Sequence, residues 1–274
     1  MCRPNIDWNA LWRKAHLERH STLRDSAFWD KRAPEFARHA KASGYVDQFT
    51  AIMKPQPSWS VLDIGCAAGT LAVPLASSVR CITAMDPSVR MRELLEDRCH
   101  RQGIKNITIV DGRWEDDWDE LGIGVHDVII ASRSLIVEDL RGAIMKLQRN
   151  ASRRVYISTL VGDGPHNREI IEAVGRNFCP GADYIVLMNL LREMQIFANL
   201  AFTCNSDEKT YGDVDEAVAS LHWMIHEMNR KEEEKLRNYL YQNLVRENGR
   251  WRLPYRRTVR WAVIWWDMDC VKNA

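Results

Sequence analysis

Residues 61–71 read Val-Leu-Asp-Ile-Gly-Cys-Ala-Ala-Gly-Thr-Leu, a short apolar run that contains one acid and ends in small residues. A helical pattern begins at about Thr70, so the segment predicts a buried strand that turns sharply into a helix. Small residues let the backbone approach a ligand closely, and the unpaired N–H groups at the start of a helix attract negative charge. The segment therefore indicates a site for a nucleotide-like cofactor.

The spacing of the glycines distinguishes one cofactor from another. A dinucleotide site would read G-x-G-x-x-G, but Ala67 takes the middle glycine position and Thr70 the last. A pyrophosphate would fit this loop poorly, which argues against a dehydrogenase that uses NAD. Asp63, two residues before Gly65, suits a ligand that carries an ammonium group.

This segment resembles the first motif of the class I methyltransferases that use S-adenosylmethionine (SAM). The motif runs hydrophobic-hydrophobic-Asp-x-Gly-x-Gly-x-Gly, and residues 61–69 match it except at Ala67. We expect the extra methyl group to be accommodated through a negative φ at Ala67. The resemblance implies that SAM is bound by Asp63, Gly65, Cys66, Ala67 and Gly69.

Short apolar runs alternate with helical patterns from residue 58 to residue 158. We expect strands over 59–64, 81–85, 107–110, 127–131 and 155–158, and helices at about 70–78, 88–102 and 137–149. This alternation predicts an α/β fold, in which a mostly parallel sheet carries helices on both faces. Ligands of such sheets bind outside the carboxyl ends of the strands.

The resemblance implies a Rossmann-like sheet of seven strands. A sixth strand is expected over 198–203 and a last one over 258–266, the last lying antiparallel between the fifth and the sixth. Helical patterns cover 183–197 and 213–245. We therefore divide the chain into a helical lid segment (1–57) and a SAM-binding domain (58–274) with a helical insertion at about 207–250.

Residues 5–54 read as three helices, which end before Pro55 and Pro57. Their position before the first strand resembles the N-terminal lid of many small-molecule methyltransferases. The alternative is a plain helical layer packed on the sheet. The density of aromatic residues favours the lid, because amphipathic rings suit concave ligand sites.

Asp86 directly follows the second predicted strand. A carboxylate at this point can accept hydrogen bonds from both hydroxyls of a ribose. The alternative role is an N-cap of the next helix, but Ser88 serves that role better. The resemblance also places the ribose-binding acid here, and we expect Pro87 and Met91 to lie against the cofactor with it.

The loop after the third strand contains Gly112, Arg113 and Trp114. In the family this loop reads roughly Gly-Asp-x-x-Asp and borders the adenine, so Gly112 matches the glycine and Arg113 stands where the acid is usual. Asp111, Glu115 or a backbone carbonyl would then accept from the adenine amine. Trp114 either covers a face of the adenine or packs in the core.

The end of the fourth strand matches the fourth motif of the family, where cofactor and substrate meet. Ser132 faces that region on this interpretation, and the guanidinium of Arg133 can hold a carboxylate or phosphate of the substrate. The alternative is a polar loop that caps the next helix. We expect Tyr45 and His166 to bind substrate with Arg133. Tyr45, His166 and His39 are candidate bases, and no catalytic residue is assigned.

Composition restricts the partners. The chain has 38 Lys and Arg against 37 Asp and Glu, a net charge of +1, which argues against a nucleic-acid partner. A basic stretch at 250–260 with Trp251 and Tyr255 keeps RNA as an alternative. His16 and His20, like His222 and His226, are four residues apart. The sequence offers no obvious third ligand beside them, so a metal site is not predicted.

The remaining patterns concern the compartment. Seven cysteines without C-x-x-C spacing predict neither a zinc site nor a disulfide framework and fit a reducing cytosol. No apolar run approaches the length of a membrane span, and no signal peptide is recognisable at the start. The expected location is cytoplasmic, without a membrane partner.

These patterns together predict an enzyme that transfers a methyl group from SAM to a small-molecule acceptor by direct displacement. The alternatives are an RNA-directed methyltransferase and a non-catalytic SAM-binding protein. No Asn-Pro-Pro-Tyr-type tetrapeptide follows the fourth strand, and in the family this argues against methylation of amino groups on bases or glutamine. The methylated atom and the oligomeric state are not indicated by the sequence.

Overall fold

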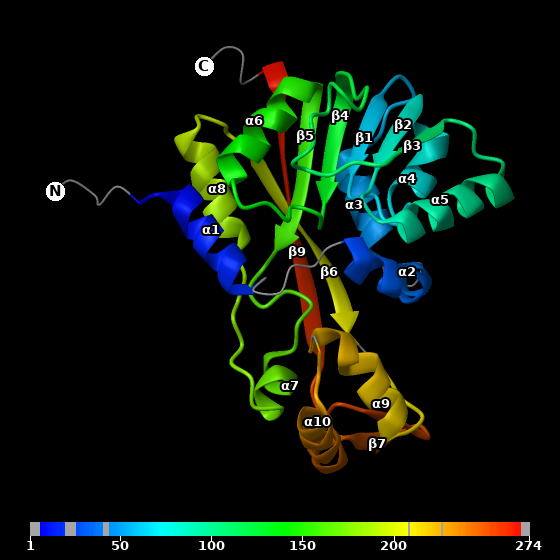
Figure 1. Ribbon diagram of the computed structural model, residues 1–274, viewed down its shortest axis with the longest axis vertical. Coiled ribbons are helices and arrows are strands. Elements are labelled where there is room, and N and C mark those ends of the chain that lie inside the picture. Colours follow the sequence, from blue (N-terminus) through cyan, green and yellow to red (C-terminus); the bar gives the residue numbers. More distant parts are fainter. Residues whose placement is uncertain (1–5, 20–25, 41–43, 208, 226, 270–274) are drawn as a thin grey trace. The chain divides into compact units, whose positions relative to one another are not determined.

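The computed structural model describes residues 6–19, 26–40, 44–207, 209–225 and 227–269. The chain divides into two compact units (Figure 1). The first comprises Met1–Leu160, Gly181–Thr203 and Trp261–Ala274, and the second comprises Val161–Pro180 and Cys204–Arg260. No helix within the described ranges is long and apolar enough to cross a membrane.

The first unit is built on a seven-stranded sheet in the order β3-β2-β1-β4-β5-β9-β6. Its strands are β1 (Ser60–Ile64), β2 (Cys81–Met85), β3 (Ile107–Val110), β4 (His126–Ser132), β5 (Ala151–Leu160), β6 (Asn199–Asp207) and β9 (Arg257–Asp267). Strands β1 to β5 pair in parallel, whereas β9 pairs antiparallel with β5. The predicted sheet is confirmed, including the position of the last strand between the fifth and the sixth.

Burial explains why these segments form strands. All five residues of β1 are buried, as are the central residues of β4 and β5. Strands covered on both faces consist of continuous apolar runs, because neither side of the pleat meets water. The sequence pattern therefore located these strands to within a few residues.

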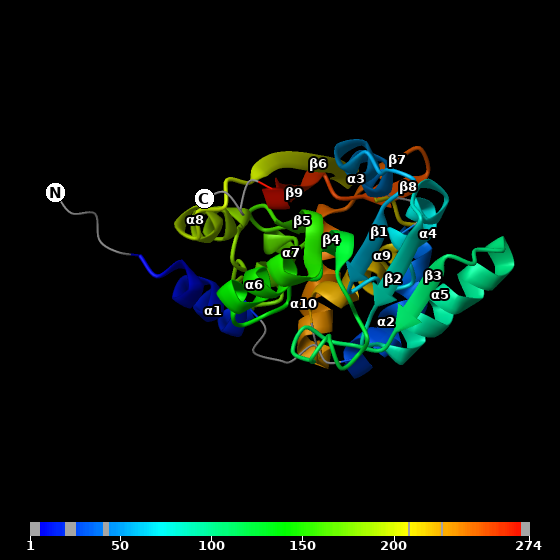
Figure 2. The same ribbon diagram turned by 90° about the horizontal axis from the view of Figure 1, so that it is seen from above.

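Helices cover both faces of this sheet. They are α1 (Trp8–Arg19), α2 (Ser26–Ala40), α3 (Tyr45–Met53), α4 (Ala72–Leu75), the 3₁₀ turn η1 (Ala76–Ser78), α5 (Val89–Gln102), α6 (Leu140–Asn150) and α8 (Tyr184–Glu193). In Figures 1 and 2, α1, α6 and α8 gather at one side of the unit and α2 and α5 at the other. Tyr45, Phe49 and Met53 of α3 are fully buried in the main core cluster. Helix α3 is therefore a structural layer on the sheet.

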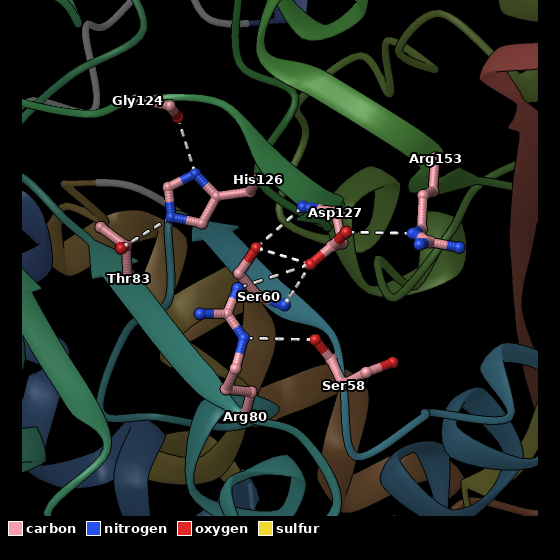
Figure 3. A network of polar contacts seen from close by, with 8 residues as sticks. All are labelled: Ser58, Ser60, Arg80, Thr83, Gly124, His126, Asp127 and Arg153. Carbon is pink, nitrogen blue, oxygen red and sulfur yellow. Dashed lines mark hydrogen bonds and ion pairs between the residues drawn. The ribbon is translucent and has the colours of Figure 1, made fainter.

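A polar network joins β1 and β4 at their amino-terminal ends (Figure 3). Asp127 accepts hydrogen bonds from the backbone N–H and the hydroxyl of Ser60, at 2.8 and 2.9 Å, and pairs with Arg153 at 3.0 Å. Ser60 returns a bond by accepting from the backbone N–H of Asp127. This network fixes the register of the central strands at the end remote from their carboxyl termini.

His126 completes the network beside the second strand. Its ring nitrogens lie 2.8 Å from the carbonyl oxygen of Gly124 and 2.8 Å from the hydroxyl of Thr83 (Figure 3). Burial lowers the pKa of His126. A neutral ring that donates to the carbonyl and accepts from the hydroxyl satisfies both contacts.

The second unit has its own core. Its elements are α7 (Arg168–Ala173), α9 (Val214–Leu221), the 3₁₀ turn η2 (His222–Met224), α10 (Arg230–Asn243), β7 (Val245–Glu247) and β8 (Arg250–Arg252). Buried residues that form the core include Ile170, Tyr211, Leu221, Leu236 and Leu240. The segment that we assigned to an insertion at about 207–250 lies in this unit, which also contains the loop after β5 and the residues up to Arg260.

The strands β7 and β8 form a hairpin that was not predicted from the sequence. The two residues between them are Asn248 and Gly249, with φ of 49° and 78°. An Asn-Gly pair with two positive φ angles is the preferred connection of a two-residue hairpin. The dipeptide was a usable signal within a stretch that otherwise reads as charged.

Candidate functional site

The loop after β1 is built on two glycines that no other residue could replace without strain. Gly65 has φ +66°, and a Cβ there would lie 2.4 Å from the Cβ of Ser134. Gly69 has φ +76°, and a Cβ there would lie 2.5 Å from a methyl carbon of Leu95. The backbone N–H of Gly65 donates to the carbonyl of Met85 at 2.8 Å. The predicted sharp turn therefore joins the ends of β1 and β2.

Ala67 differs from its predicted conformation. We expected a negative φ, but φ is +49°, in the left-handed region. Its backbone N–H donates to Oδ2 of Asp86 at 2.8 Å. The loop thus keeps the glycine-type conformation at this position, at a cost of about 1 kcal/mol for a residue with a Cβ. The hydrogen bond to Asp86 holds the strained conformation.

Asp86 connects this loop to the start of α5. Its side chain is buried, Oδ2 accepts from Ala67, and Oδ1 accepts from the N–H of Ser88 at 2.9 Å. Ser88 caps α5 by accepting from the N–H of Met91, as predicted. Burial raises the pKa of Asp86. Each carboxylate oxygen has a further lone pair, so both remain able to accept from a ribose hydroxyl.

Asp63 contains a buried oxygen without a partner. The side chain is 3% exposed, and its carboxylate accepts from the N–H of Ala72. Oδ2 makes no hydrogen bond within the described part of the chain. The pKa of Asp63 is raised to about 7, mainly by burial and secondly by the charge of Asp86. An unpaired buried oxygen is costly, and a donor such as an ammonium group would satisfy it.

Tyr45, Ser132 and Arg133, which the sequence placed in one site, do come together. The hydroxyl of the fully buried Tyr45 lies 2.6 Å from Oγ of Ser132 and 2.7 Å from Oγ of Ser158. The Arg133 guanidinium carbon lies 4.2 Å from the centre of the Tyr45 ring and 5.5 Å from that of Trp261. Ser158 and Trp261 were not predicted, because nothing in β5 or β9 marks them in sequence.

The predicted adenine loop is tightly packed at Gly112. A Cβ there would approach Leu121 and Met85 to 2.8 Å. Arg113 is exposed, its backbone N–H donates to Asp116 at 2.8 Å, and its guanidinium lies 3.3 Å from the hydroxyl of Ser26 in α2. Arg113 therefore contacts the N-terminal segment, and Asp116 serves the turn of its own loop.

Trp114 has a specific partner. Its half-buried indole donates to the backbone carbonyl of Ser134 at 2.8 Å and is tilted against Trp118, with 5.8 Å between the rings. The hydroxyl of Ser134 donates to the carbonyl of Ile64 at 2.5 Å. Trp114 thus connects the loop after β3 to the loops after β4 and β1.

Helix α2 docks on the start of α5. Asp30 accepts from the hydroxyl of Ser88 at 2.5 Å and from the N–H of Arg90 at 3.1 Å. Ala33 packs against Met91 in a small apolar cluster that includes Ala67 and Ala68 of the cofactor loop. The N-terminal segment therefore contacts the candidate site directly. Pro87, which precedes Ser88, is half-buried.

The histidines singled out in the sequence belong to both units of the chain. His166 is buried in the second unit, with its ring 5.3 Å from that of Trp223. His39 belongs to α2, but its side chain lies outside the described part, as do His20 and His226. In the described ranges no three His, Cys, Asp or Glu side chains gather as metal ligands.

The basic stretch of the second unit is mostly engaged in internal contacts. Arg252 pairs with Glu247, Arg250 pairs with Glu216 at 3.3 Å, and Arg257 donates to backbone carbonyls. The unit contains a small cavity of about 110 Å³ beside Arg252 and Arg257. These guanidiniums therefore stabilise the unit's own loops.

Comparison with known proteins decides the family. A family described as a methyltransferase domain matches residues 61–153, from β1 into β5. The chain therefore contains a methyltransferase domain, and its seven-stranded sheet has the class I SAM-dependent methyltransferase fold. The methyltransferase domain implies SAM as its cofactor. The residues present fit this cofactor, because the buried oxygen of Asp63, unpaired among the described residues, can accept a hydrogen bond from its ammonium group.

Proteins similar to this methyltransferase match it over most of its length. An uncharacterised protein of Haemophilus influenzae is 33% identical over 245 residues, which are 88% of this chain and 89% of the relative. Two solved structures share the fold. A putative methyltransferase from Bacillus halodurans has a TM-score of 0.55 at 12% identity and covers 81% of this chain and 98% of its own. The YcgJ protein from Bacillus subtilis has a TM-score of 0.54 at 13% identity, with 84% and 98% covered.

Proposed function

We propose that this methyltransferase transfers the methyl group of SAM to a small-molecule acceptor by direct displacement. The observation that carries the proposal is the pair of buried carboxylates, Asp63 and Asp86, at the ends of β1 and β2. One oxygen of Asp63 is unpaired within the described ranges. When bound, SAM supplies a methyl group on a positively charged sulfur, which is already a good electrophile. The protein then has to align the two reactants and exclude water.

The cofactor-binding residues divide by chemistry. Asp63 accepts from the ammonium group, and Asp86 accepts from the ribose hydroxyls while its other lone pairs hold Ala67 and Ser88. Gly65, Cys66 and Gly69 bring backbone close to the ligand. The adenine lies against Gly112, Arg113 and Trp114, with Pro87 and Met91 beside the ribose. This assignment follows the order in which these residues end successive strands.

The acceptor binds at the end of β4. Tyr45, Ser132 and Arg133 provide hydroxyl groups and one cation there. A general base is needed only if the nucleophile must lose a proton. Tyr45 is a poor base, because burial raises its pKa and keeps the phenol protonated. His166 belongs to the second unit and remains a proposed substrate-binding residue.

Calorimetry tests the cofactor site. We expect both SAM and its demethylated product, S-adenosylhomocysteine, to bind the folded protein. Asp86→Ala should weaken binding by roughly 1–3 kcal/mol, because buried hydrogen bonds are lost. The exposed Asp119→Ala serves as a control that should bind normally. Absence of heat with either ligand, in a sample shown to be folded, would refute the proposal.

The class of acceptor needs a separate test. The enzyme is incubated with SAM carrying a labelled methyl group and with fractionated metabolites or total RNA. Label in the small-molecule fraction supports the proposal. Label in RNA alone would replace it with an RNA-directed methyltransferase. No label in any fraction, from a protein that binds SAM, would favour a non-catalytic binding protein.

A further inference from the structure

The backbone of Arg133 is held in an unfavourable conformation. Its φ is +58°, although it is not a glycine, and it directly follows the last residue of β4. Its N–H donates to the carbonyl of Ser158 in β5 at 3.0 Å, which fixes the conformation. Strained residues of this kind persist where the surrounding structure enforces them, and they are concentrated at functional sites.

The side chain of Arg133 is held by two aromatic rings. Its guanidinium carbon is 4.2 Å from the ring centre of Tyr45, from α3, and 5.5 Å from that of Trp261, from β9. Aromatic faces attract the cation. They do not replace the paired oxygens that a guanidinium fork binds in its own plane.

Arg133 has no acidic partner within the described residues, whereas Arg154 and Arg92 of the same unit do. Arg154 is the matched case, since its guanidinium carbon lies 5.9 Å from the Tyr156 ring. Its terminal nitrogen is also 2.5 Å from a carboxylate oxygen of Asp267. Arg92 likewise pairs with Asp111 at 2.7 Å. Only Arg133 combines the aromatic support with an unused fork among these three.

The position of Arg133 connects this cation to the site. The next residue, Ser134, donates to the carbonyl of Ile64 and leaves no space for a side chain at Gly65. We infer that Arg133 receives an anionic group, a carboxylate or phosphate, where cofactor and acceptor meet. This inference rests on the proposed function, because it requires both molecules at the end of β4.

Two molecules can bring the anion. If it is the amino-acid carboxylate of SAM, Asp63 and Arg133 hold the two charges of one zwitterion. If it belongs to the acceptor, the substrate class is a small organic acid or phosphate ester. These two sources make opposite predictions for a cofactor that lacks its carboxylate.

Calorimetry with SAM and decarboxylated SAM forms the first arm. For a cofactor carboxylate, we expect wild type to bind decarboxylated SAM at least about tenfold more weakly than SAM. Arg133→Met should then bind the two equally. Arg133→Lys keeps the positive charge and serves as a second variant in case Arg133→Met fails to fold. Arg154→Met is the control, and it should keep the preference of wild type.

Side-chain NMR of the arginine Nε–H groups, with S-adenosylhomocysteine saturating, forms the second arm. The Arg133 signal is identified by its absence in Arg133→Met. For an acidic acceptor, acetate or inorganic phosphate should shift this signal saturably, while the Arg154 signal stays in place and SAM shows no advantage over its decarboxylated form. For a cofactor carboxylate, the signal is already shifted and neither anion moves it.

The inference is overturned if wild type binds SAM and decarboxylated SAM equally and neither anion moves the Arg133 signal. That result leaves the proposed function intact, because SAM still binds. Failure of wild type to bind either SAM or S-adenosylhomocysteine would instead refute the proposed function, and the inference with it. The two failures are therefore distinguishable in the first titration.

Discussion

Single residues of the cofactor loop combine strain with unsatisfied charge. Ala67 takes a left-handed conformation that favours glycine, and Asp63 holds a buried carboxylate oxygen that has no partner among the residues that the structure describes. Both features lower the stability of the free protein. Such costs are tolerated at binding sites, where a ligand makes the missing contacts.

Ala67→Gly should stabilise the free protein by about 0.5–1 kcal/mol. Removal of the Cβ relieves the strain at φ +49°, and this gain exceeds the entropy that glycine adds to the unfolded chain. The matched control is Ala68→Gly, at the next, buried position, whose φ is not positive. That variant should be less stable than wild type. Urea unfolding measures both, and a destabilised Ala67→Gly would contradict the strain.

Asp63→Asn should remove a pH dependence of stability. The raised pKa of about 7 means that the folded state binds the proton more tightly than the unfolded chain. Stability from this group is therefore complete below about pH 4 and is lost as the pH rises through 7. Without ligand, Asp63→Asn should gain stability relative to wild type between pH 5 and 8, by up to about 1.4 kcal/mol per pKa unit. Urea unfolding at pH 5 and pH 8 measures the effect. The prediction is excluded if the free energies of unfolding of wild type and Asp63→Asn differ by the same amount at both pH values.

At the scale of elements, α2 connects the N-terminal segment to the cofactor loop and to the start of α5. Its Asp30 supplies a second acceptor at the start of α5, beside the Ser88 cap. Its Ala33 packs on Met91. The buried helix α3, by contrast, behaves as a layer of the sheet. The predicted lid is therefore best assigned to α2, and its closure remains a prediction.

Asp30→Ala should loosen α2 and weaken SAM binding. The variant removes acceptors from the Ser88 hydroxyl and the Arg90 N–H, a loss of about 1 kcal/mol. Limited proteolysis should cleave the N-terminal segment faster in the variant, and SAM should slow cleavage in wild type. Asp47→Ala, at an exposed position in α3, is the control. Cleavage that does not respond to SAM would argue against closure of α2 over the cofactor.

At the scale of the whole chain, two cores form separately. In the first unit, α3, α4 and α5 share one cluster with the central strands, and the residues of α7, α9 and α10 share another in the second unit. Strands β6 and β9 carry the chain between the two units. Each unit therefore has its own set of residues on which its stability depends.

Leu236→Ala should destabilise the second unit alone. Leu236 is fully buried there, and such a truncation costs about 2–5 kcal/mol. Hydrogen exchange should quicken across α9 and α10 but stay unchanged in β1 and β4. Leu147→Ala, at a buried position of α6, should show the opposite distribution. Uniformly faster exchange in both variants would show that the units unfold together.

Local signals in the sequence were sufficient for much of the fold. Strands over 81–85 and 107–110 were predicted at the observed residues, because each buried parallel strand is a bounded apolar run. Asp86 and the Ser88 cap were recognised from their position after such a run. The Asn248-Gly249 hairpin was missed, although its turn signal was present, because its strands are short and exposed.

The positions of the strands along the chain, the bend after β1 and the acids at the strand ends follow from the sequence alone, because periodicity and turn chemistry act between neighbouring residues. The surroundings of Arg133 do not. Tyr45, Ser158 and Trp261 come from α3, β5 and β9, and only the pairing of β9 with β5 and the packing of α3 on the sheet bring them together. Contacts between distant segments depend on how the whole core packs, so this cationic centre became visible only once the chain was folded.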